Sequence, residues 1–508
     1  HVDGGEDRYS ATDATVTPGV TISMKSMIHK IHNGSELAST YEVAGYPSDS
    51  TATGYPNYNL NDYSDVVFPT WPMEAATCAE CHEGGDGSNT SNPSRQACGS
   101  CHDTIDFTET SSSADSYHDG GPMSSDAVCY LCHTPTLIES VHADPRTDAD
   151  VWADNGHAAG KSGVNVEVLT AVNGSGSTAF AVGDQITVTF SVLYDDGTPI
   201  PQSFFAYSSA SSTCPTVAGS GTAILAGPSE HMQKVISTAS AGSTTVVGSI
   251  YGSSTVDSTT GIWTYTFINT DSSAQTIPST FPLQYYDSAT TLVGVPYGDW
   301  YGEALAAGTY RLSIAMYTAM WEDVGCPSGT TTSERWRQAD TAYLDILVGG
   351  ATTVEEHSVV DEDSCNNCHG TVEFHGKTRT SPDYCIMCHT PGAVDSTGVE
   401  SINLMNMIHK IHSSDQLENG YKVGSYDWGT TPVTFPNQNG GVADCEACHG
   451  SNDEYLNPSA LACMSCHDSD DAAAHAALMT DDTYGESCDV CHDESSEFNV
   501  TDVHAWVK

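Results

Sequence analysis

Sixteen of the 18 cysteines in this 508-residue chain lie in eight copies of one pentapeptide, Cys-x-x-Cys-His. Two thiols at this spacing add to the vinyl groups of one haem, and the adjacent histidine then reaches the iron, so the pattern is the attachment signal of c-type haem. Chance predicts roughly 0.03 matches at this composition, and zinc sites need no histidine directly after each second cysteine. The sequence therefore predicts eight haems c, attached at Cys78, Cys81, Cys98, Cys101, Cys129, Cys132, Cys365, Cys368, Cys385, Cys388, Cys445, Cys448, Cys463, Cys466, Cys488 and Cys491.

The motif histidines are the predicted proximal iron ligands: His82, His102, His133, His369, His389, His449, His467 and His492. The second axial ligand decides whether an iron carries electrons or binds a substrate. Nine other histidines are candidates for that position, and for each the alternative is a solvated surface residue: His29, His32, His118, His142, His375, His409, His412, His475 and His504. The spare or inter-subunit candidates are His157, His357 and His1, whereas His231 is expected to be an ordinary surface histidine.

An internal repeat divides the motifs into two groups. The hexapeptide MIHKIH occurs at residues 27–32 and again at 407–412, and each copy is followed by three motifs and a Val-His pair. The sequence therefore predicts two homologous haem modules of mostly coil and short helices, residues 1–159 with three haems and residues 355–508 with five. The first module is interpreted as a five-haem unit that lacks its opening two haems.

Residues 160–354 have a different composition, with one histidine, no haem motif and many Ser, Thr and Gly residues. Apolar residues alternate with polar ones in several short stretches separated by turn residues, first at Ile186, Val188, Phe190 and Val192. This pattern predicts an antiparallel β-sandwich or split barrel between the haem modules. Cys214 and Cys326 lie here and are predicted to form a disulfide, because haem c is attached outside the cytoplasm, where disulfides persist; the alternative is two separate thiols.

The composition excludes several classes of partner. The chain has 15 Lys and Arg against 66 Asp and Glu, a formal net charge of −51, whereas nucleic acid and anionic lipid are bound through basic surfaces. No stretch approaches the roughly 18–20 consecutive apolar residues of a membrane span, and the polar start HVDGGEDRYS is typical of a processed chain. The acidic run at 468–471 makes calcium a candidate ligand, although no EF-hand pattern occurs.

The motifs and their surroundings resemble the outer-membrane decahaem c-type cytochromes of metal-reducing bacteria, the MtrC/OmcA type. The resemblance is carried by VVDEDSCNNCHG, FHGKTRT, YCIMCHTP and NLMNMIHKIH, followed by three spaced motifs and a terminal Val-His. Members of that family alternate β domains with pentahaem modules and carry bis-His haems. This chain has eight motifs instead of ten, and its sequence contains neither the family's usual β domain ahead of the first module nor an N-terminal lipidation cysteine.

The resemblance implies an extracellular or cell-surface protein, exported across the cytoplasmic membrane, that conducts electrons to other cytochromes or redox partners and to minerals, flavins or electrodes. We predict no catalytic residue, since no motif carries the Lys in place of His that marks the active haem of multihaem nitrite and hydroxylamine enzymes.

Three other hypotheses remain open from the sequence. The first is a terminal reductase of metal oxides, flavins or a nitrogen oxide, which would be marked by a high-spin haem. The second is a head-to-tail homopolymer, a cytochrome filament in which a surplus histidine of one chain ligates an iron of the next. The third and weakest is an adhesive β protein with redox-silent haems.

Overall fold

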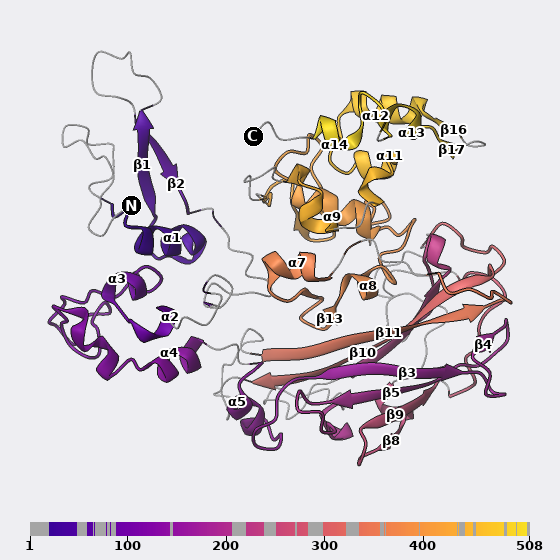
Figure 1. Cartoon of the computed structure of the whole chain (residues 1–508), viewed down its shortest axis with the longest axis horizontal. Helices are drawn as coiled ribbons and strands as arrows, with labels where there is room; N and C mark the ends of the chain where they lie inside the picture. Colours follow the sequence, from indigo (N-terminus) through magenta and orange to yellow (C-terminus); the bar gives the residue numbers. More distant parts are fainter. Residues whose placement is uncertain are drawn as a thin grey trace. The chain divides into compact units, whose positions relative to one another are not determined.

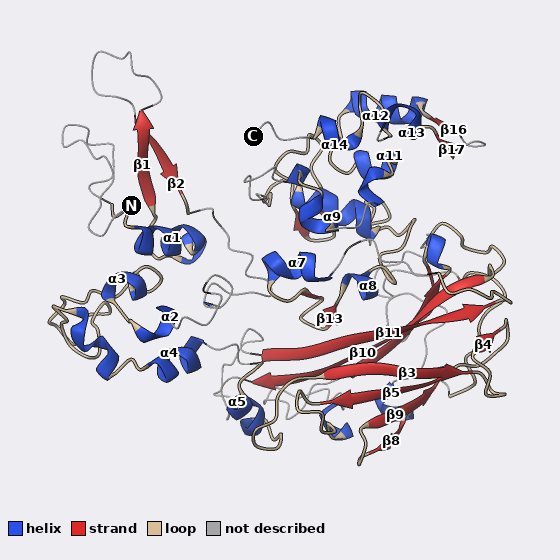
Figure 2. Ribbon diagram, viewed as in Figure 1, coloured by secondary structure: helices blue, strands red, loops and turns tan. Residues whose placement is uncertain are grey.

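The computed structural model describes most of the chain, which forms two compact units, residues 1–144 and 145–508. Figures 1 and 2 show the elements of both units. Cys81, Cys214, Cys326, His1 and His357 lie outside the described residues, and so does the predicted Cys214–Cys326 disulfide. The described residues are 20–47, 58–64, 66, 78, 82, 88–142, 146–205, 220–237, 250–269, 272–282, 298–321, 335–355, 360, 362–395, 397–433, 435, 442–450, 454–481, 485–493 and 495–504.

The first unit consists of short helices and one hairpin joined by loops. Its longest helix, α1, covers the first MIHKIH sequence, and its two strands pair antiparallel. The porphyrins are expected to supply much of the apolar interior here, which is why the sequence shows little helical or strand periodicity. The elements are α1 (Met24–His32), β1 (Glu42–Pro47), β2 (Tyr58–Asp62), α2 (Ser88–Ser91), α3 (Arg95–Cys98) and α4 (Pro135–His142).

The second unit begins with a β domain of two sheets, which lie against each other in the lower right of Figure 1. The four-stranded sheet has the order β3-β5-β9-β8, with β3 (Asn165–Val172), β5 (Thr187–Leu193), β9 (Ile262–Thr266) and β8 (Thr255–Asp257). The five-stranded sheet has the order β4-β11-β10-β6-β7, with β4 (Ala179–Phe180), β11 (Arg335–Val348), β10 (Gly308–Trp321), β6 (Ser220–Gly227) and β7 (Gln233–Ser237). Every pairing is antiparallel except that of the two-residue strand β4 with β11, which is parallel.

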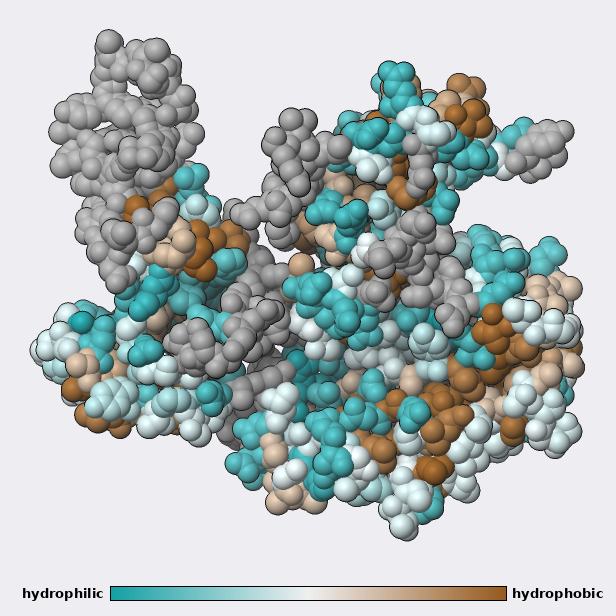
Figure 3. Space-filling view, in the orientation of Figure 1, coloured by the Kyte–Doolittle hydropathy of each residue, from teal (hydrophilic) through white to brown (hydrophobic). Residues whose placement is uncertain are grey.

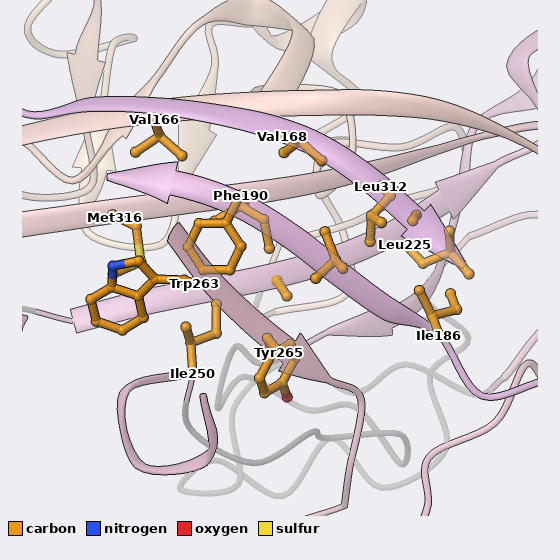
Figure 4. Close-up of a cluster of buried hydrophobic side chains, with 14 of the residues drawn as sticks. Val166, Val168, Ile186, Phe190, Leu225, Ile250, Trp263, Tyr265, Leu312 and Met316 are labelled. Carbon is orange, nitrogen blue, oxygen red and sulfur yellow. The ribbon is translucent and has the colours of Figure 1, made fainter. Parts of the chain in front are cut away.

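One buried cluster fills the space between the two sheets (Figure 4). The alternating residues Ile186, Val188, Phe190 and Val192 are all fully buried, and Trp263 from β9 stacks on Phe190. Leu225 from β6 and Leu312 and Met316 from β10 join them from the other sheet. Burial of each such side chain contributes roughly 1.5–3 kcal/mol, so this cluster stabilises the β domain without any cofactor.

The segment before β3 packs with the β domain. Helix α5 (Ala149–Asp154) places Trp152 in the same buried cluster, and its indole Nε1 donates to the carbonyl of Arg146 at 2.7 Å. Arg146 in turn forms a buried ion pair with Glu373. The chain is therefore tied to the β domain from residue 146 onward, ahead of the first long strand.

The rest of the second unit is built from short helices and two-residue strands, with α9 covering the second MIHKIH sequence. Its helices are α7 (Glu362–His369), α8 (Pro382–Cys385), α9 (Leu404–His412), α10 (Glu446–His449), α11 (Ala460–Cys463), α12 (Asp470–Leu478), α13 (Asp489–His492) and α14 (Val500–Val503). Its hairpins pair β12 (Glu373–Phe374) with β13 (Arg379–Thr380), β14 (Lys422–Val423) with β15 (Tyr426–Asp427), and β16 (Thr480–Asp481) with β17 (Gly485–Glu486).

Polar residues dominate the surface, in keeping with the acidic composition. On the visible face in Figure 3 the β domain is mostly teal and white, with an apolar strip over β3 and β11. In the part of the chain that the structure describes, no helix combines the length and apolar character needed to cross a bilayer.

Candidate haem sites

Each described haem motif folds as a helical turn. In seven motifs the backbone N–H of the histidine donates to the carbonyl of the first cysteine at 2.9–3.0 Å, and the eighth motif histidine, His369, ends helix α7. Residues three and four positions apart lie on the same face of such a turn. In the seven motifs that are described throughout, the two cysteines and the histidine are therefore presented on one side, as thioether attachment and iron ligation require.

Each of the eight motif histidines faces a second histidine of the same unit. The two ring centroids of every pair lie 5.9–6.3 Å apart, although most partners are far apart in sequence. The pairs are His82 with His29, His102 with His142, His133 with His118, His369 with His412, His389 with His375, His449 with His409, His467 with His504 and His492 with His475.

This separation fits a metal ion between the rings. Two metal–imidazole bonds of about 2 Å, each lengthened by about 1 Å from nitrogen to ring centre, place two centroids about 6 Å apart. Direct ring stacking would bring the centroids closer, and a shared hydrogen bond would need nitrogen atoms in contact. The residues therefore fit a haem iron with two axial histidines at each of the eight positions.

Backbone carbonyls orient several of these rings. The Nδ1–H of His142, His412 and His504 donates to the carbonyl four residues earlier, at 2.8–2.9 Å. His389 and His492 donate to the carbonyls of Ile402 and Phe498, both at 2.8 Å. A bond at Nδ1 fixes the tautomer and leaves Nε2 unprotonated, so that Nε2 can bind iron.

Burial favours the neutral imidazole, which is the form that binds a metal. Desolvation lowers the pKa of His409 and of His389 to about 4, and it also lowers the pKa of His29, His375 and His412. These five rings are therefore held uncharged at neutral pH.

The remaining histidines have other surroundings. The Nδ1–H of His32 donates to the carbonyl of Ile28 at 2.9 Å. His157 is buried in the β domain, where it stacks on Phe204 with centroids 3.6 Å apart and bonds to the hydroxyl of Tyr194 at 2.8 Å. His231, expected on the surface, is half-buried and stacks on Trp300.

A repeated polar contact, which was not predicted from the sequence, fixes the MIHKIH helix to a haem motif. In the second unit Asn406 on α9 donates to the hydroxyl of Ser465, inside the motif at 463–467, at 2.7 Å. In the first unit Ser26 on α1 and Ser100, inside the motif at 98–102, are joined at 2.9 Å. All four side chains are buried. Aligning the two modules at MIHKIH would have placed Ser26 opposite Asn406, which is the signal that could have revealed them.

A second repeated contact uses the residue directly after the motif histidine. Asp468 accepts the backbone N–H groups of Glu418 and Asn419, both at 2.8 Å. Asp103 accepts those of Ala38 and Ser39 at 3.1 and 2.8 Å. Each aspartate thus holds the loop that follows the MIHKIH helix, so these carboxylates have a structural role within an otherwise solvated acidic surface.

The other expected ligands receive no support from the described residues. Among the described residues, no group of three or more His, Cys, Asp or Glu side chains is arranged to hold a further metal ion, so no observation supports bound calcium.

Two family models match parts of the chain. Residues 357–505 match the model of outer membrane cytochrome MtrC/MtrF-like, domains II/IV, and residues 72–140 match that of cytochrome c3. No curated protein matches.

Two solved structures are similar at low sequence identity. The crystal structure of MtrC from Shewanella baltica OS185 is 16% identical with a TM-score of 0.44, over 94% of this chain and 68% of that one. The outer membrane decaheme cytochrome OmcA is 16% identical with a TM-score of 0.38, over 67% of this chain and 48% of that one. The two matched ranges are thus similar to domains of c-type electron-transport cytochromes, and together they contain all eight Cys-x-x-Cys-His motifs of the sequence.

Proposed function

We propose that the protein is an extracellular electron conduit that carries eight bis-His haems. The observation that supports this most directly is the set of eight histidine pairs, each with the ring separation of an iron ligated on both sides. An iron with two protein ligands has no open position for a substrate, so it exchanges electrons without forming a bond to the donor or acceptor. The haem supplies the redox chemistry, and the chain supplies spacing, ligation and local charge.

The partners follow from the same proposal. Donors are other cytochromes or redox proteins, and acceptors are minerals, flavins or electrodes outside the cell, as the family resemblance implies. The location is the cell surface or the extracellular space. We propose the domain arrangement 1–159, 160–354 and 355–508, with a β-sandwich or split barrel between two haem modules; the cytochrome c3 and MtrC/MtrF-like matches fall in the first and third ranges.

The decisive experiment is ligand binding by the fully loaded, reduced protein. The expected result is eight low-spin haems per chain by electron paramagnetic resonance (EPR) of the oxidised protein and by visible spectroscopy, no binding of carbon monoxide by the reduced protein, and rapid oxidation of the reduced protein by flavin or ferric oxide particles. A high-spin haem that binds carbon monoxide or nitrite would refute the conduit and favour the alternative, a terminal reductase acting on metal oxides, flavins or a nitrogen oxide.

A head-to-tail filament remains a separate prediction. The eight pairs leave no iron for a histidine of a neighbouring copy, so the pairing argues against ligation of iron between subunits. A homopolymer would therefore be held by protein contacts between subunits of net charge −51, with repulsion to overcome. Electron microscopy of the loaded protein tests this: regular fibres would support it, and monodisperse single chains would refute it.

A further inference from the structure

The haem motif at residues 385–389 lies against the five-stranded sheet of the β domain. Residues 373–391, here named the junction segment, contain both cysteines and both paired histidines of that haem, Cys385, Cys388, His375 and His389. Figure 1 shows α8 and β13, which belong to this segment, beside β10 and β11. The segment therefore links one haem site directly to the five-stranded sheet.

Apolar packing holds the junction segment on the sheet. Tyr384, directly before the first motif cysteine, is 3% exposed, and Met387, between the two motif cysteines, is 0% exposed. They pack in one buried cluster with Ile224, Ala226, Met232 and Ala315 from the sheet and its adjoining turn. The Tyr384 hydroxyl also bonds to Thr222 at 2.7 Å. Water is thus excluded from the side of the motif that faces the β domain.

Positive side chains gather around the same segment. Arg311 binds Asp383 at 2.5 Å and Asp345 at 3.0 Å, and Arg337 donates to the carbonyl of Gly376. Arg146 pairs with Glu373, and Arg379 lies over the Tyr384 ring at 5.6 Å. Lys234, which is 8% exposed, acts electrostatically on His389. Five of the 15 Lys and Arg residues of the chain therefore surround one haem site.

The other motifs of the second unit have the opposite charge environment. Within five residues of the motifs at 365, 445, 463 and 488 the sequence contains at least three acidic residues and no Lys or Arg. The same interval around the motif at 385 contains one acidic residue, Asp383, and that carboxylate is paired with Arg311. In sequence, the chain around the motif at 385 is thus less acidic than the chain around the other four motifs, and in the structure the positive charges of Arg337, Arg379 and Lys234 add to this difference.

Charge and burial act in the same direction on a haem iron. Reduction adds one electron to the ferric iron, so nearby positive charges favour the ferrous form and nearby carboxylates oppose it. Removal of water also favours the ferrous form, because a ferric iron with two neutral ligands carries the extra charge.

We propose that the haem attached at Cys385 and Cys388 has the highest reduction potential of the five haems in residues 355–508. This inference rests on the proposed haem ligation. In the step concerned, one electron passes from a neighbouring ferrous haem to the ferric haem of the junction segment, with no proton and no bond exchanged. At equilibrium, a single electron in this module would therefore lie mainly on the haem beside the β domain.

The test is an optical redox titration of the full-length, haem-loaded protein. The variant Arg379→Gln removes one charge beside the site without touching a ligand. Its matched variant Arg379→Lys keeps the charge, and Lys422→Gln removes an exposed charge elsewhere in the same module, where Lys422 pairs with Asp427 at 2.9 Å. Lys234→Gln approaches the site from the sheet and serves as a second charge removal should Arg379→Gln fail to fold.

We expect Arg379→Gln to shift only the part of the titration at highest potential. A tenfold fall in the ferrous to ferric ratio at fixed potential corresponds to 59 mV for one electron, and the shift is expected to approach this size and to be absent in Arg379→Lys and Lys422→Gln. A shift in the middle or low part of the curve, an equal shift in Lys422→Gln, or an unchanged curve would overturn the inference. A protein with fewer than eight low-spin haems would instead overturn the proposed function.

Discussion

Replacing His412 by alanine should convert one of the eight irons to a high-spin state. The His412 ring lies 6.2 Å from that of His369, and its Nδ1–H is held by the carbonyl of Ile408 at 2.9 Å. Alanine cannot ligate iron, so the haem at Cys365 and Cys368 would keep only the imidazole of His369. An iron with one axial ligand is high-spin and has an open position.

The size of the effect follows from the pairing. One iron in eight loses its partner, so about one eighth of the low-spin EPR intensity should be replaced by a high-spin signal. The other seven pairs do not use His412, and their intensity should remain. Carbon monoxide should bind one haem per reduced chain, and added imidazole should restore the low-spin signal because it fills the vacated position.

His32→Ala is the matched control within the same molecule. His32 occupies the position of His412 in the other copy of MIHKIH, and residues 1–26, which precede that copy, contain no Cys-x-x-Cys-His motif. We expect this variant to retain eight low-spin irons. A high-spin signal from His32→Ala, or an unchanged spectrum from His412→Ala, would show that the pairing described here is wrong.

Three further outcomes are expected. The two ring planes make angles of 64–88° in the His102, His369 and His492 pairs and of 24–44° in the other five histidine pairs. EPR should therefore show two classes of low-spin signal in a ratio of three to five, and a single class would contradict the ring geometry. Asn406→Leu should lower the free energy of unfolding by about 1–3 kcal/mol, since it removes a buried hydrogen bond, with calorimetry as the measurement and a cost near zero as the contrary result. Burial lowers the pKa of His157 from 6.5 in the unfolded state to about 4 in the folded state. The stability that this residue contributes is therefore complete above pH 6.5 and falls by roughly 3 kcal/mol as the pH drops to 4. The free energy of unfolding of His157→Gln, measured against pH, should lack this fall, and a pH dependence equal to that of the parent protein would refute the prediction.

The haem attachment residues were predictable because their chemistry is local. A thioether pair and its histidine must lie within one helical turn, so five consecutive residues specify the site. The distal ligands were predictable only as a set, from the repeat and the surplus of histidine. Their assignment was beyond the sequence: His375 follows the motif at 365–369 but faces His389 of the next motif, since hairpin β12–β13 turns it away.

In the β domain too, the local sequence pattern predicted which residues are buried but not how the strands are ordered. Alternation at Ile186, Val188, Phe190 and Val192 predicted the buried face of β5 because each second residue of a strand points to one side. The parallel pairing of β4 with β11 joins residues 168 positions apart, and the strand order rests on further pairings between strands distant in sequence, which no local pattern encodes. The contact of the sheet with the junction segment was likewise invisible in the sequence.

Helix α9 carries two histidines that belong to two different pairs. His409 faces His449 and His412 faces His369, and three residues of helix advance about 4.5 Å along the axis. The spacing of the two haems that His409 and His412 would hold therefore depends on the hydrogen-bonded geometry of one helix more than on the packing of loops. Because electron tunnelling rates fall exponentially with distance, a hop between these two haems should be insensitive to thermal motion of the surrounding coil. Helix α1 of the first unit carries His29, which faces His82, and His32 at the same three-residue spacing.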